Sequence, residues 1–493
     1  MNLLAQVWLI SPLVAIFATA LVVLIVDVVQ EEPCRSTSLG ITILGLVAAA
    51  GLNCAVGMGL AKAQLAFSGM VVVDGYAVFI QFVLILAALG TLLLGHDHFE
   101  RIGVSIPEVR PLLLFSLMGM MLMALSAELM MLFIAIEVMS IALYVLCGVN
   151  RSSEKGVESA FKYFVLGSFS TAILLYGIAL IWGATGSTQF SEIAMWLRQG
   201  HTIMGTPMMA AGVAMLLVGL AFKVAAVPFH MWSPDVYEGA PTPITAFMAT
   251  GVKVASFAAI GRVLFSALLL GHGDWVDALV WLSGLTILVG NVAALVQDNL
   301  KRMLAYSSIS HAGYLLMAVV AVSPEGGVAG NPQLGGVLFY LLSYTLMTIG
   351  AFAVVSLLAR DGEEDASVTQ LAGLAGRHPW VAAGMAVCLL SLAGIPPTMG
   401  FIGKFYVFTA AINGGFYSLA IVGAVGGAVG VYYYLRPIVM MYMHEAEEEV
   451  PMAINLPAMG ALGLGAGSML VFGLMPGPVV DWCRTALLSM MGA

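Results

Sequence analysis

The residues with the clearest chemical potential in this sequence are ionisable side chains inside long apolar stretches. The chain has seven lysines, and five lie within or at the edge of an apolar segment: Lys162, Lys223, Lys253, Lys301 and Lys404. A carboxylate, Glu137, lies in the apolar sequence LFIAIEVMSIALYVL. A charged group within a bilayer is costly, so such residues usually face a protein interior or a water-filled path. We therefore expect these side chains to take part in moving charge.

Proline interrupts the apolar stretch at residues 216–260. Lys223 lies five residues before Pro228, and Pro241 then begins a second apolar helix that contains Lys253. Proline removes a helical hydrogen bond. Inside a membrane this is tolerated only where the freed groups line a cavity or find protein partners. The stretch therefore has the features of a site for moving charge.

A second interrupted helix is predicted at residues 379–413, where Pro396 and Pro397 precede Lys404. It has the same ingredients as the first interruption, namely a proline break and an isolated lysine. Interrupted helices at corresponding positions of two halves are typical of transport sites. The sequence therefore predicts one such site in each half.

Glu137 and Lys223 could form a switch. Burial favours the neutral form of a lysine, whereas a nearby carboxylate favours the charged form. If the two groups approach each other, both stay charged. If they separate, Lys223 can release its proton.

A relay could continue from this pair. Lys253 could pass the proton on, with Lys301 and His311 as steps towards Lys404. Each assignment has a structural alternative: Lys162 could extend to the membrane surface, Lys301 could be a loop charge that sets topology, and His311 could be a hydrogen-bonded core residue.

The composition indicates which kind of secondary structure holds these ionisable groups in place. The chain is 61 % hydrophobic and 9 % charged, with a mean hydropathy of +1.02, whereas soluble proteins have about 25 % charged residues. This indicates an all-α polytopic membrane protein. Since a span needs about 20 apolar residues, we predict fourteen transmembrane helices, at 3–29, 38–60, 74–95, 109–127, 128–148, 157–183, 206–229, 241–270, 275–297, 300–322, 333–359, 379–413, 416–443 and 453–475.

These helices suggest an internal repeat. We predict an N-terminal three-helix segment at 1–108, a first five-helix repeat at 109–270, a second at 275–443, and a C-terminal helix at 444–493. The interrupted helix is the fourth of each repeat. An odd number of helices per repeat implies that the second copy is inverted.

Basic residues indicate the orientation. Most loop arginines and lysines follow odd-numbered helices, whereas loops after even-numbered helices hold little beyond Lys62 and Arg198. Cytoplasmic loops are enriched in lysine and arginine. Both termini are therefore predicted on the outer side, and the run Val7 to Val26 is predicted to be a first helix and not a cleaved signal.

The cysteines exclude some site types. None of them has C-x-x-C spacing: Cys34, Cys54, Cys147, Cys388 and Cys483. We expect no metal, iron–sulfur or disulfide framework. The net charge of -9 is concentrated in two acidic loops, so the sequence indicates no basic face for nucleic acid.

Several stretches resemble a known family. The run FKVAAVPFHMWSPDVYEGAPTPITAF resembles the proton-translocating membrane domain shared by antiporter-like subunits of complex I, the NADH–quinone oxidoreductase, and Mrp-type cation/proton antiporters. AFKYFVLGSFS, GVKVASFAAI and KRMLAYSSISHAGY are similar to the subunit N branch, which is similar to mitochondrial subunit 2. Lysine at both 253 and 404 favours that branch, because subunit L usually has histidine at the first position and subunit M glutamate at the second.

The resemblance implies a role for each position. It implies Glu137 and Lys223 as a coupled pair, Lys253 and Lys301 as central lysines, Lys404 as the exit-side lysine, and Lys162 as a further family lysine. It also implies fourteen helices with two inverted five-helix repeats, in the inner membrane of a bacterium. NAD, FMN, iron–sulfur clusters and quinone are expected in partner subunits and no cofactor in this chain. The expected partners are other membrane subunits, including the sister antiporter-like subunits.

Three functions compete at this point. The leading one is a proton-translocating subunit of NADH–quinone oxidoreductase, coupled to quinone reduction elsewhere in the complex. The second is a component of an Mrp-type sodium/proton antiporter, for which sodium-dependent counterflow in vesicles would argue. The third is a membrane scaffold without transport, which predicts that apolar residues can replace the lysines.

Overall fold

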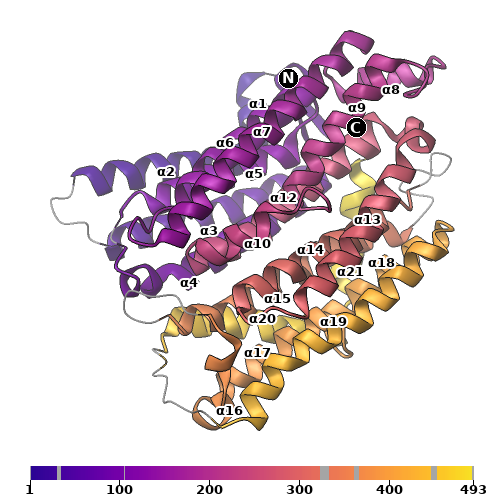
Figure 1. Cartoon of the computed structure of the whole chain (residues 1–493). Helices are drawn as coiled ribbons and strands as arrows, with labels where there is room; N and C mark the ends of the chain where they lie inside the picture. Colours follow the sequence, from indigo (N-terminus) through magenta and orange to yellow (C-terminus); the bar gives the residue numbers. More distant parts are fainter. Residues whose placement is uncertain are drawn as a thin grey trace.

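A computed structural model of the chain describes residues 2–29, 35–104, 106–322, 332–359, 366–445, 452 and 454–490. Within these residues the protein is a bundle of helices with one small antiparallel hairpin, β1 (Gln64–Ala66) and β2 (Val71–Val73). Figure 1 shows the early helices along one side of the bundle and the late helices along the other. The sequence prediction of a mostly helical membrane protein is confirmed, but the hairpin was not predicted.

The first half of the bundle contains α1 (Leu3–Leu9), α2 (Ser11–Val29), α3 (Arg35–Gly59), α4 (Gly75–Arg101), α5 (Val109–Leu125), α6 (Leu129–Cys147), α7 (Glu154–Thr185), α8 (Phe190–Arg198), α9 (Pro207–Lys223), α10 (Trp232–Gly239), α11 (Thr242–Phe247) and α12 (Lys253–Arg262). Two π-helical segments, Met248–Val252 and Val263–Ala267, flank α12. The predicted division at residues 126–128 is confirmed, because α5 ends at Leu125 and α6 begins at Leu129.

The second half contains α13 (His272–Ala294), α14 (Leu300–Val319), α15 (Gly335–Leu357), α16 (Leu374–Arg377), α17 (Pro379–Ala393), α18 (Met399–Asn413), α19 (Tyr417–Met443), α20 (Leu456–Leu474) and α21 (Gly477–Ser489). Among the described residues, ten helical segments are long and apolar enough to cross a membrane, and three further apolar helices are shorter. The three shorter ones are α5 and the first halves of both interrupted helices, α9 and α17.

Several helices differ from the sequence prediction. The first predicted helix, 3–29, is divided at Ile10 into α1 and α2. The helix predicted to continue to residue 229 ends at Lys223, five residues before the proline. After α20, a further helix, α21, follows that the hydropathy pattern did not indicate. Proline thus marks the interruption, but the chain leaves the helix one turn earlier.

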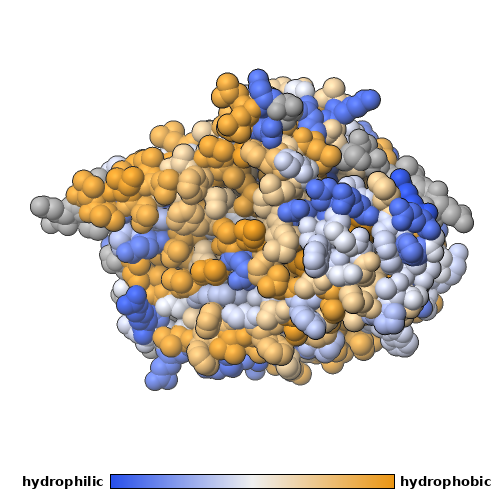
Figure 2. Space-filling model, turned by 90° about the horizontal axis from the view of Figure 1, so that it is seen from above, coloured by the Kyte–Doolittle hydropathy of each residue, from blue (hydrophilic) through white to orange (hydrophobic). Residues whose placement is uncertain are grey.

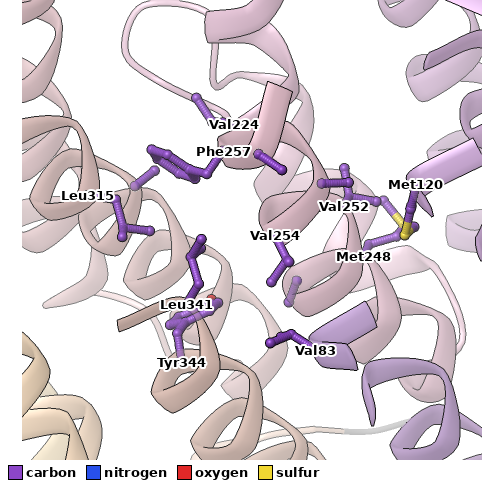
Figure 3. Close-up of a cluster of buried hydrophobic side chains, with 14 of the residues drawn as sticks. Val83, Met120, Val224, Met248, Val252, Val254, Phe257, Leu315, Leu341 and Tyr344 are labelled. Carbon is purple, nitrogen blue, oxygen red and sulfur yellow. The ribbon is translucent and has the colours of Figure 1, made fainter. Parts of the chain in front are cut away.

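Two helical segments occupy the centre of the bundle. The apolar windows of residues 242–267 and of α15 are wholly buried within the protein. Figure 3 shows side chains of neighbouring helices meeting around them, including Val83 of α4, Met120 of α5 and Leu315 of α14. The outer helices instead expose large apolar side chains such as Phe169 and Trp182, and Figure 2 shows broad hydrophobic areas on one face. An apolar exterior of this kind suits contact with lipid.

Both chain ends lie at the hairpin end of the bundle. Gln6 of α1 accepts a hydrogen bond from the backbone N–H of Phe67 at 2.7 Å. Ser489 of α21 accepts one from the N–H of Tyr76 at 3.1 Å. Since Phe67 lies in the segment between α3 and α4 and Tyr76 is the second residue of α4, the first and last described helices both contact this short part of the chain.

The first interruption, residues 224–231, is held by side chains of two elements. The N–H of Val227 donates to Thr286 Oγ1 of α13 at 2.9 Å. The indole N–H of Trp232, at the start of α10, donates to the carbonyl of Phe222 at 3.0 Å. Side-chain partners therefore satisfy backbone groups that the break releases.

The second interruption depends on a close backbone approach. The N–H of Gly400, in α18, donates to Ser391 Oγ of α17 at 3.1 Å. A Cβ atom at Gly400 would lie 2.1 Å from the carbonyl oxygen of Ser391. The two half-helices can meet in this way only because residue 400 has no side chain.

We therefore expect Gly400→Ala to destabilise the protein by about 1–3 kcal/mol, the usual cost of overpacking a tight site. Thermal unfolding of the purified protein measures this change. Gly460→Ala in α20 is the matched control, since nothing lies within 4 Å of its added Cβ. Equal unfolding temperatures for the two variants would contradict the idea that a close backbone approach requires glycine here.

Candidate functional site

Lys223 is the last residue of α9 and is 2 % exposed. Its ammonium donates to Ser140 Oγ of α6 at 2.9 Å, and its Nζ lies 5.8 Å from the ring centroid of Phe222. Ser140 follows Glu137 by three residues, so the two share a face of α6. Lys223 therefore points at the helix that carries the predicted carboxylate.

Glu137 and Lys223 do not form an ion pair in this structure, although both are described. The Oε1 atom of Glu137 is buried without a hydrogen-bond partner. A hydroxyl, and not the carboxylate, therefore accepts the hydrogen bond from Lys223. Ser140 was missed by sequence reasoning, although its spacing of three residues from Glu137 is a signal that could have indicated it.

Aromatic side chains connect this region to the first interruption. The rings of Tyr144 and Tyr163 lie 4.9 Å apart, Tyr163 stacks on Trp232 at 4.7 Å, and Trp232 stacks on Phe222 at 5.5 Å. The hydroxyls of Tyr144 and Tyr163 are buried without a hydrogen-bond partner in the described structure. Near Lys223 there are thus both aromatic rings and buried hydroxyl groups that have no hydrogen-bond partner in the described structure.

Lys253 lies at the start of α12, directly after a π-helical segment, and is 3 % exposed. Its ammonium donates to the backbone carbonyl of Ser308 and to Ser308 Oγ, the latter at 2.5 Å. The same Nζ lies 5.0 Å from the ring centroid of Tyr344. Lys253 therefore binds α14 and α15 of the second half, although its own helix belongs to the first.

His311 of α14 is 1 % exposed and contacts two tyrosine hydroxyls. Its Nδ1 lies 2.5 Å from Tyr340 OH and its Nε2 lies 3.0 Å from Tyr434 OH. Its ring centroid is 5.0 Å from that of Tyr344, which also contacts Lys253. His311 thus has the hydrogen-bonded core position that was one alternative from sequence, and it shares Tyr344 as a neighbour with Lys253.

Lys404 reaches back across the second interruption. Its ammonium donates to the carbonyls of Leu392 and Ala393, at the end of α17, both at 2.9 Å. Gly394, with φ of +82°, follows, and a Cβ there would come within 3.3 Å of Nζ. Lys404 thus lies after its break whereas Lys223 lies before the other one, so the two positions are not equivalent.

Lys301 is buried near the start of α14, with 1 % of its surface exposed. Its ammonium donates at 2.6 Å to the carbonyl of Ala240, the residue that follows α10. The neighbouring Arg302 is instead partly exposed. The alternative of an exposed loop charge therefore fits Arg302 better than Lys301.

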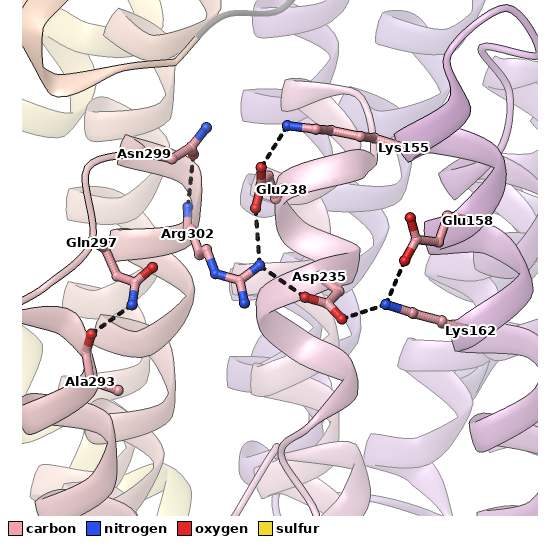
Figure 4. A network of polar contacts seen from close by, with 9 residues as sticks. All are labelled: Lys155, Glu158, Lys162, Asp235, Glu238, Ala293, Gln297, Asn299 and Arg302. Carbon is pink, nitrogen blue, oxygen red and sulfur yellow. Dashed lines mark hydrogen bonds and ion pairs between the residues drawn. The ribbon is translucent and has the colours of Figure 1, made fainter.

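Lys162 lies apart from the buried lysines. It is partly exposed and forms ion pairs with Glu158 at 2.6 Å and Asp235 at 2.7 Å. Figure 4 shows these residues in a larger network with Lys155, Glu238 and Arg302. Sequence reasoning missed Asp235 and Glu238, because it relied on the prolines at 228 and 241 and assigned no helix to the segment WSPDVYEG between them, which forms the half-helix α10.

Basic partners stabilise the charged forms of these carboxylates. Partial burial raises the pKa of Asp235, but hydrogen bonds from Lys162 and Arg302 outweigh burial and hold that pKa below its ordinary value of 3.8. Burial likewise raises the pKa of Glu238, and Lys155 and Arg302 hold it below 4.5. The ion pairs therefore stabilise the folded protein above these values, and this contribution is lost as the pH falls through the lowered pKa values.

This sign predicts a pH-dependent effect of Arg302→Gln. At pH 7 the variant should lose two partly exposed ion pairs, each worth about 0.2–1 kcal/mol. The difference from the unchanged protein should shrink below about pH 4, where ordinary carboxyl groups become protonated. Unfolding temperatures measured across that range check this, and a constant difference would contradict it.

Comparison with known proteins adds an independent observation. Residues 126–430 match the family model for the NADH:quinone oxidoreductase/Mrp antiporter transmembrane region. The chain is 44 % identical to NADH-quinone oxidoreductase subunit N of Trichlorobacter lovleyi, over 97 % of this chain and 96 % of the relative.

Two solved structures have a similar fold. A chain in respiratory complex I from Thermus thermophilus has a TM-score of 0.79 and 34 % identity, over 95 % of this chain and 98 % of that one. A chain in the Mrp complex from Dietzia sp. has a TM-score of 0.82 but 21 % identity, over 99 % and 98 % of the two chains, so it supports the fold alone.

Proposed function

Because the chain belongs to the NADH:quinone oxidoreductase/Mrp antiporter family, we propose that it translocates protons as an antiporter-like membrane subunit of NADH–quinone oxidoreductase. One observation carries the proposal. Three buried lysines, Lys223, Lys253 and Lys404, each donate hydrogen bonds to uncharged oxygen atoms. Burial disfavours the charged form and these hydrogen bonds favour it, so a neighbouring charge can shift the balance and release a proton.

Glu137 and Lys223 form the control element of this proposal. In the described geometry Ser140 accepts the hydrogen bond from Lys223, and Glu137 lies one helical turn away. Rotation of the lysine side chain towards the carboxylate would keep both groups charged. Rotation back to Ser140 leaves the ammonium with a neutral partner and ready to lose its proton.

The second half would carry the proton towards Lys404. Lys253 is bound at Ser308, and His311 lies between Tyr340 and Tyr434. An imidazole with a hydroxyl at each nitrogen can accept a proton on one side and release one on the other. The buried hydroxyls of Ser256, Ser343 and Thr348 are further polar groups to which internal water can bind.

We extend the proposal to the membrane arrangement. The observed helices are compatible with fourteen spans, with two inverted repeats at 109–270 and 275–443 between the segments 1–108 and 444–493. Both termini then lie on the outer side of a bacterial inner membrane. This orientation rests on the distribution of loop arginines and lysines.

The electron-transfer chemistry is assigned to partner subunits. They would hold NAD, FMN, iron–sulfur clusters and quinone, and this chain would hold no cofactor. Other membrane subunits, including sister antiporter-like subunits, are the proposed partners. The 44 % identity to a subunit N relative favours this assembly over an Mrp-type sodium/proton antiporter, because the family model covers both families and the Mrp chain is similar in fold alone.

Glu137→Gln tests the proposed function. The amide keeps the volume of the side chain but cannot hold Lys223 charged, so we expect proton pumping to fall about tenfold or more, as for other positioned proton-transfer groups. Proton uptake by inverted vesicles, followed with a pH-sensitive dye, measures the change. Pumping at the unchanged ratio of protons to quinone reduced would remove Glu137 from the mechanism.

A further inference from the structure

A charged cavity lies at the end of the bundle opposite the hairpin. At the hairpin end, isolated β-bridges join Val71 to Ser126 and Glu128 to Gln189, close to where α7 ends. The cavity lies at the beginning of α7, about 45 Å away along this 32-residue helix. The cavity has a volume of about 180 Å³. It is lined by residues of α7, α10 and α14: Lys155, Glu158, Ser159, Asp235, Glu238, Gly239 and Arg302.

Two carboxylates of α10 are held in this cavity from both sides. Glu238 accepts from Lys155 of α7 at 2.9 Å and from Arg302 of α14 at 3.0 Å. Asp235 accepts from Lys162 at 2.7 Å and from the same Arg302 at 2.8 Å. Figure 4 shows Arg302 between the two acids. Because an arginine effectively never releases its proton, Arg302 can position these acids but cannot carry protons.

The cavity is next to a buried lysine. Ala240 follows Glu238 by two residues, and its carbonyl accepts the hydrogen bond from Lys301 at 2.6 Å. Lys301 and Arg302 are consecutive residues of α14, of which the arginine contacts the cavity acids and the lysine is 1 % exposed. The water-accessible carboxylate of Glu238 and the carbonyl that binds the buried Lys301 are therefore within about one turn of each other at the end of α10.

Backbone contact fixes this arrangement. A Cβ atom at Gly239 would lie 2.2 Å from the carbonyl oxygen of Lys155. The end of α10 thus touches the first turns of α7 directly, which holds Glu238 at the cavity wall. Ser308, to which Lys253 is bound, lies seven residues after Lys301 in α14, or about 10 Å along the helix.

We propose that this cavity is where protons enter the chain, with Glu238 as the acceptor and Lys301 as the first internal carrier. Once Lys301 has passed its own proton on, Glu238 takes a proton from water and gives it to the Lys301 amine, which restores the carboxylate. Lys301 then passes the proton towards Ser308 and Lys253, and Asp235 and Arg302 position Glu238. The proposal deepens the proposed function and rests on it.

The test compares Glu238→Gln with Glu238→Asp in the assembled complex, in inverted vesicles with an uncoupler. Glutamine keeps a hydrogen-bonding group for Arg302 but accepts no proton. The NADH-driven quinone reductase rate of Glu238→Gln should fall about tenfold or more at alkaline pH, a size usual for a lost proton-transfer group, and recover towards acidic pH. Glu238→Asp should keep the original pH profile.

Glu154→Gln is the matched control, since Glu154 is exposed in the first turn of α7 and outside the cavity. It should leave the profile unchanged. A Glu238→Gln rate that is unchanged, or equally reduced at every pH, would overturn the proposal, because a purely structural role does not depend on proton supply. Lys301→Arg is a second variant that keeps the hydrogen bond to Ala240 while blocking release, and wild-type pumping by it would also overturn the proposal.

Lys223→Met, measured in parallel, distinguishes a failure of the proposed function from a failure of the proposed proton entry through this cavity. If it pumps normally, the proposed function itself fails. If it fails to pump while Glu238→Gln and Lys301→Arg behave like the unchanged complex, only the intake through this cavity is wrong.

Discussion

Lys223→Arg should abolish proton pumping while the complex still assembles. Arginine keeps the positive charge and can still donate to Ser140, which accepts the hydrogen bond from Lys223 at 2.9 Å. The reference pKa of arginine exceeds that of lysine by about two units or more, so proton release should become rarer by at least about 100-fold. Slower release should also slow the quinone reduction that drives it.

Dye-based proton uptake by inverted vesicles, recorded with the quinone reductase rate, measures both effects. Lys223→Met is the companion variant, because it removes the charge and should abolish pumping for a different reason. Subunit content of the purified complex controls for assembly. Pumping by the arginine variant at wild-type efficiency would mean that Lys223 is a fixed charge and not a carrier.

Lys404→Ala should abolish pumping and also weaken the protein. The ammonium of Lys404 donates to the carbonyls of Leu392 and Ala393. Without it these buried acceptors lose their partner, at about 1–3 kcal/mol for each unsatisfied group. We therefore expect a lower unfolding temperature together with a loss of proton release at the outer side.

Lys404→Gln separates the two effects. Its amide can donate to one of the two carbonyls but carries no transferable proton. It should recover part of the stability and none of the pumping, measured by thermal unfolding and by the same vesicle assay. Full quinone reductase activity with normal pumping in either variant would exclude Lys404 from the path.

Burial of Lys223, Lys253 and Lys404 could be predicted from sequence, because a single charge in a long apolar run is costly unless it lies inside the protein. For Lys301 the alternative of a loop charge was open, and Lys162 is partly exposed. Lys223, Lys253, Lys301 and Lys404 are all at most 9 % exposed. Most helix positions were also predictable, since hydropathy alone determines which stretches can span a membrane. Their roles in proton transfer stay predictions.

The hydrogen-bond partners could not be predicted, because they depend on which helices meet. Ser308 is 55 residues from Lys253, and Tyr434 is 123 residues from His311. No periodicity within one helix encodes such contacts. A serine or tyrosine in an apolar run is also common, so its type gives little indication of its use.

The predicted position of the first helix break was wrong for a related reason. Proline prevents a helix from continuing through it, but tertiary contacts decide where the chain leaves the helix. Here Thr286 of α13 binds the N–H of Val227, and Trp232 binds the carbonyl of Phe222. These contacts stabilise an open segment that begins directly after Lys223.

Two of the buried lysines bind the carbonyl end of a half-helix: Lys301 at Ala240 after α10, and Lys404 at Leu392 and Ala393 of α17. The carbonyl end of a helix carries about half a negative charge, and its attraction weakens within a turn. A counterion built from a helix end can be moved as a rigid piece, unlike a carboxylate on its own helix. Sliding α10 or α17 along its axis by a fraction of a turn would change how firmly the ammonium is held. Displacement of the half-helix would then change the proton affinity of the lysine. A force transmitted along the bundle could in this way cause the lysine to bind or release a proton.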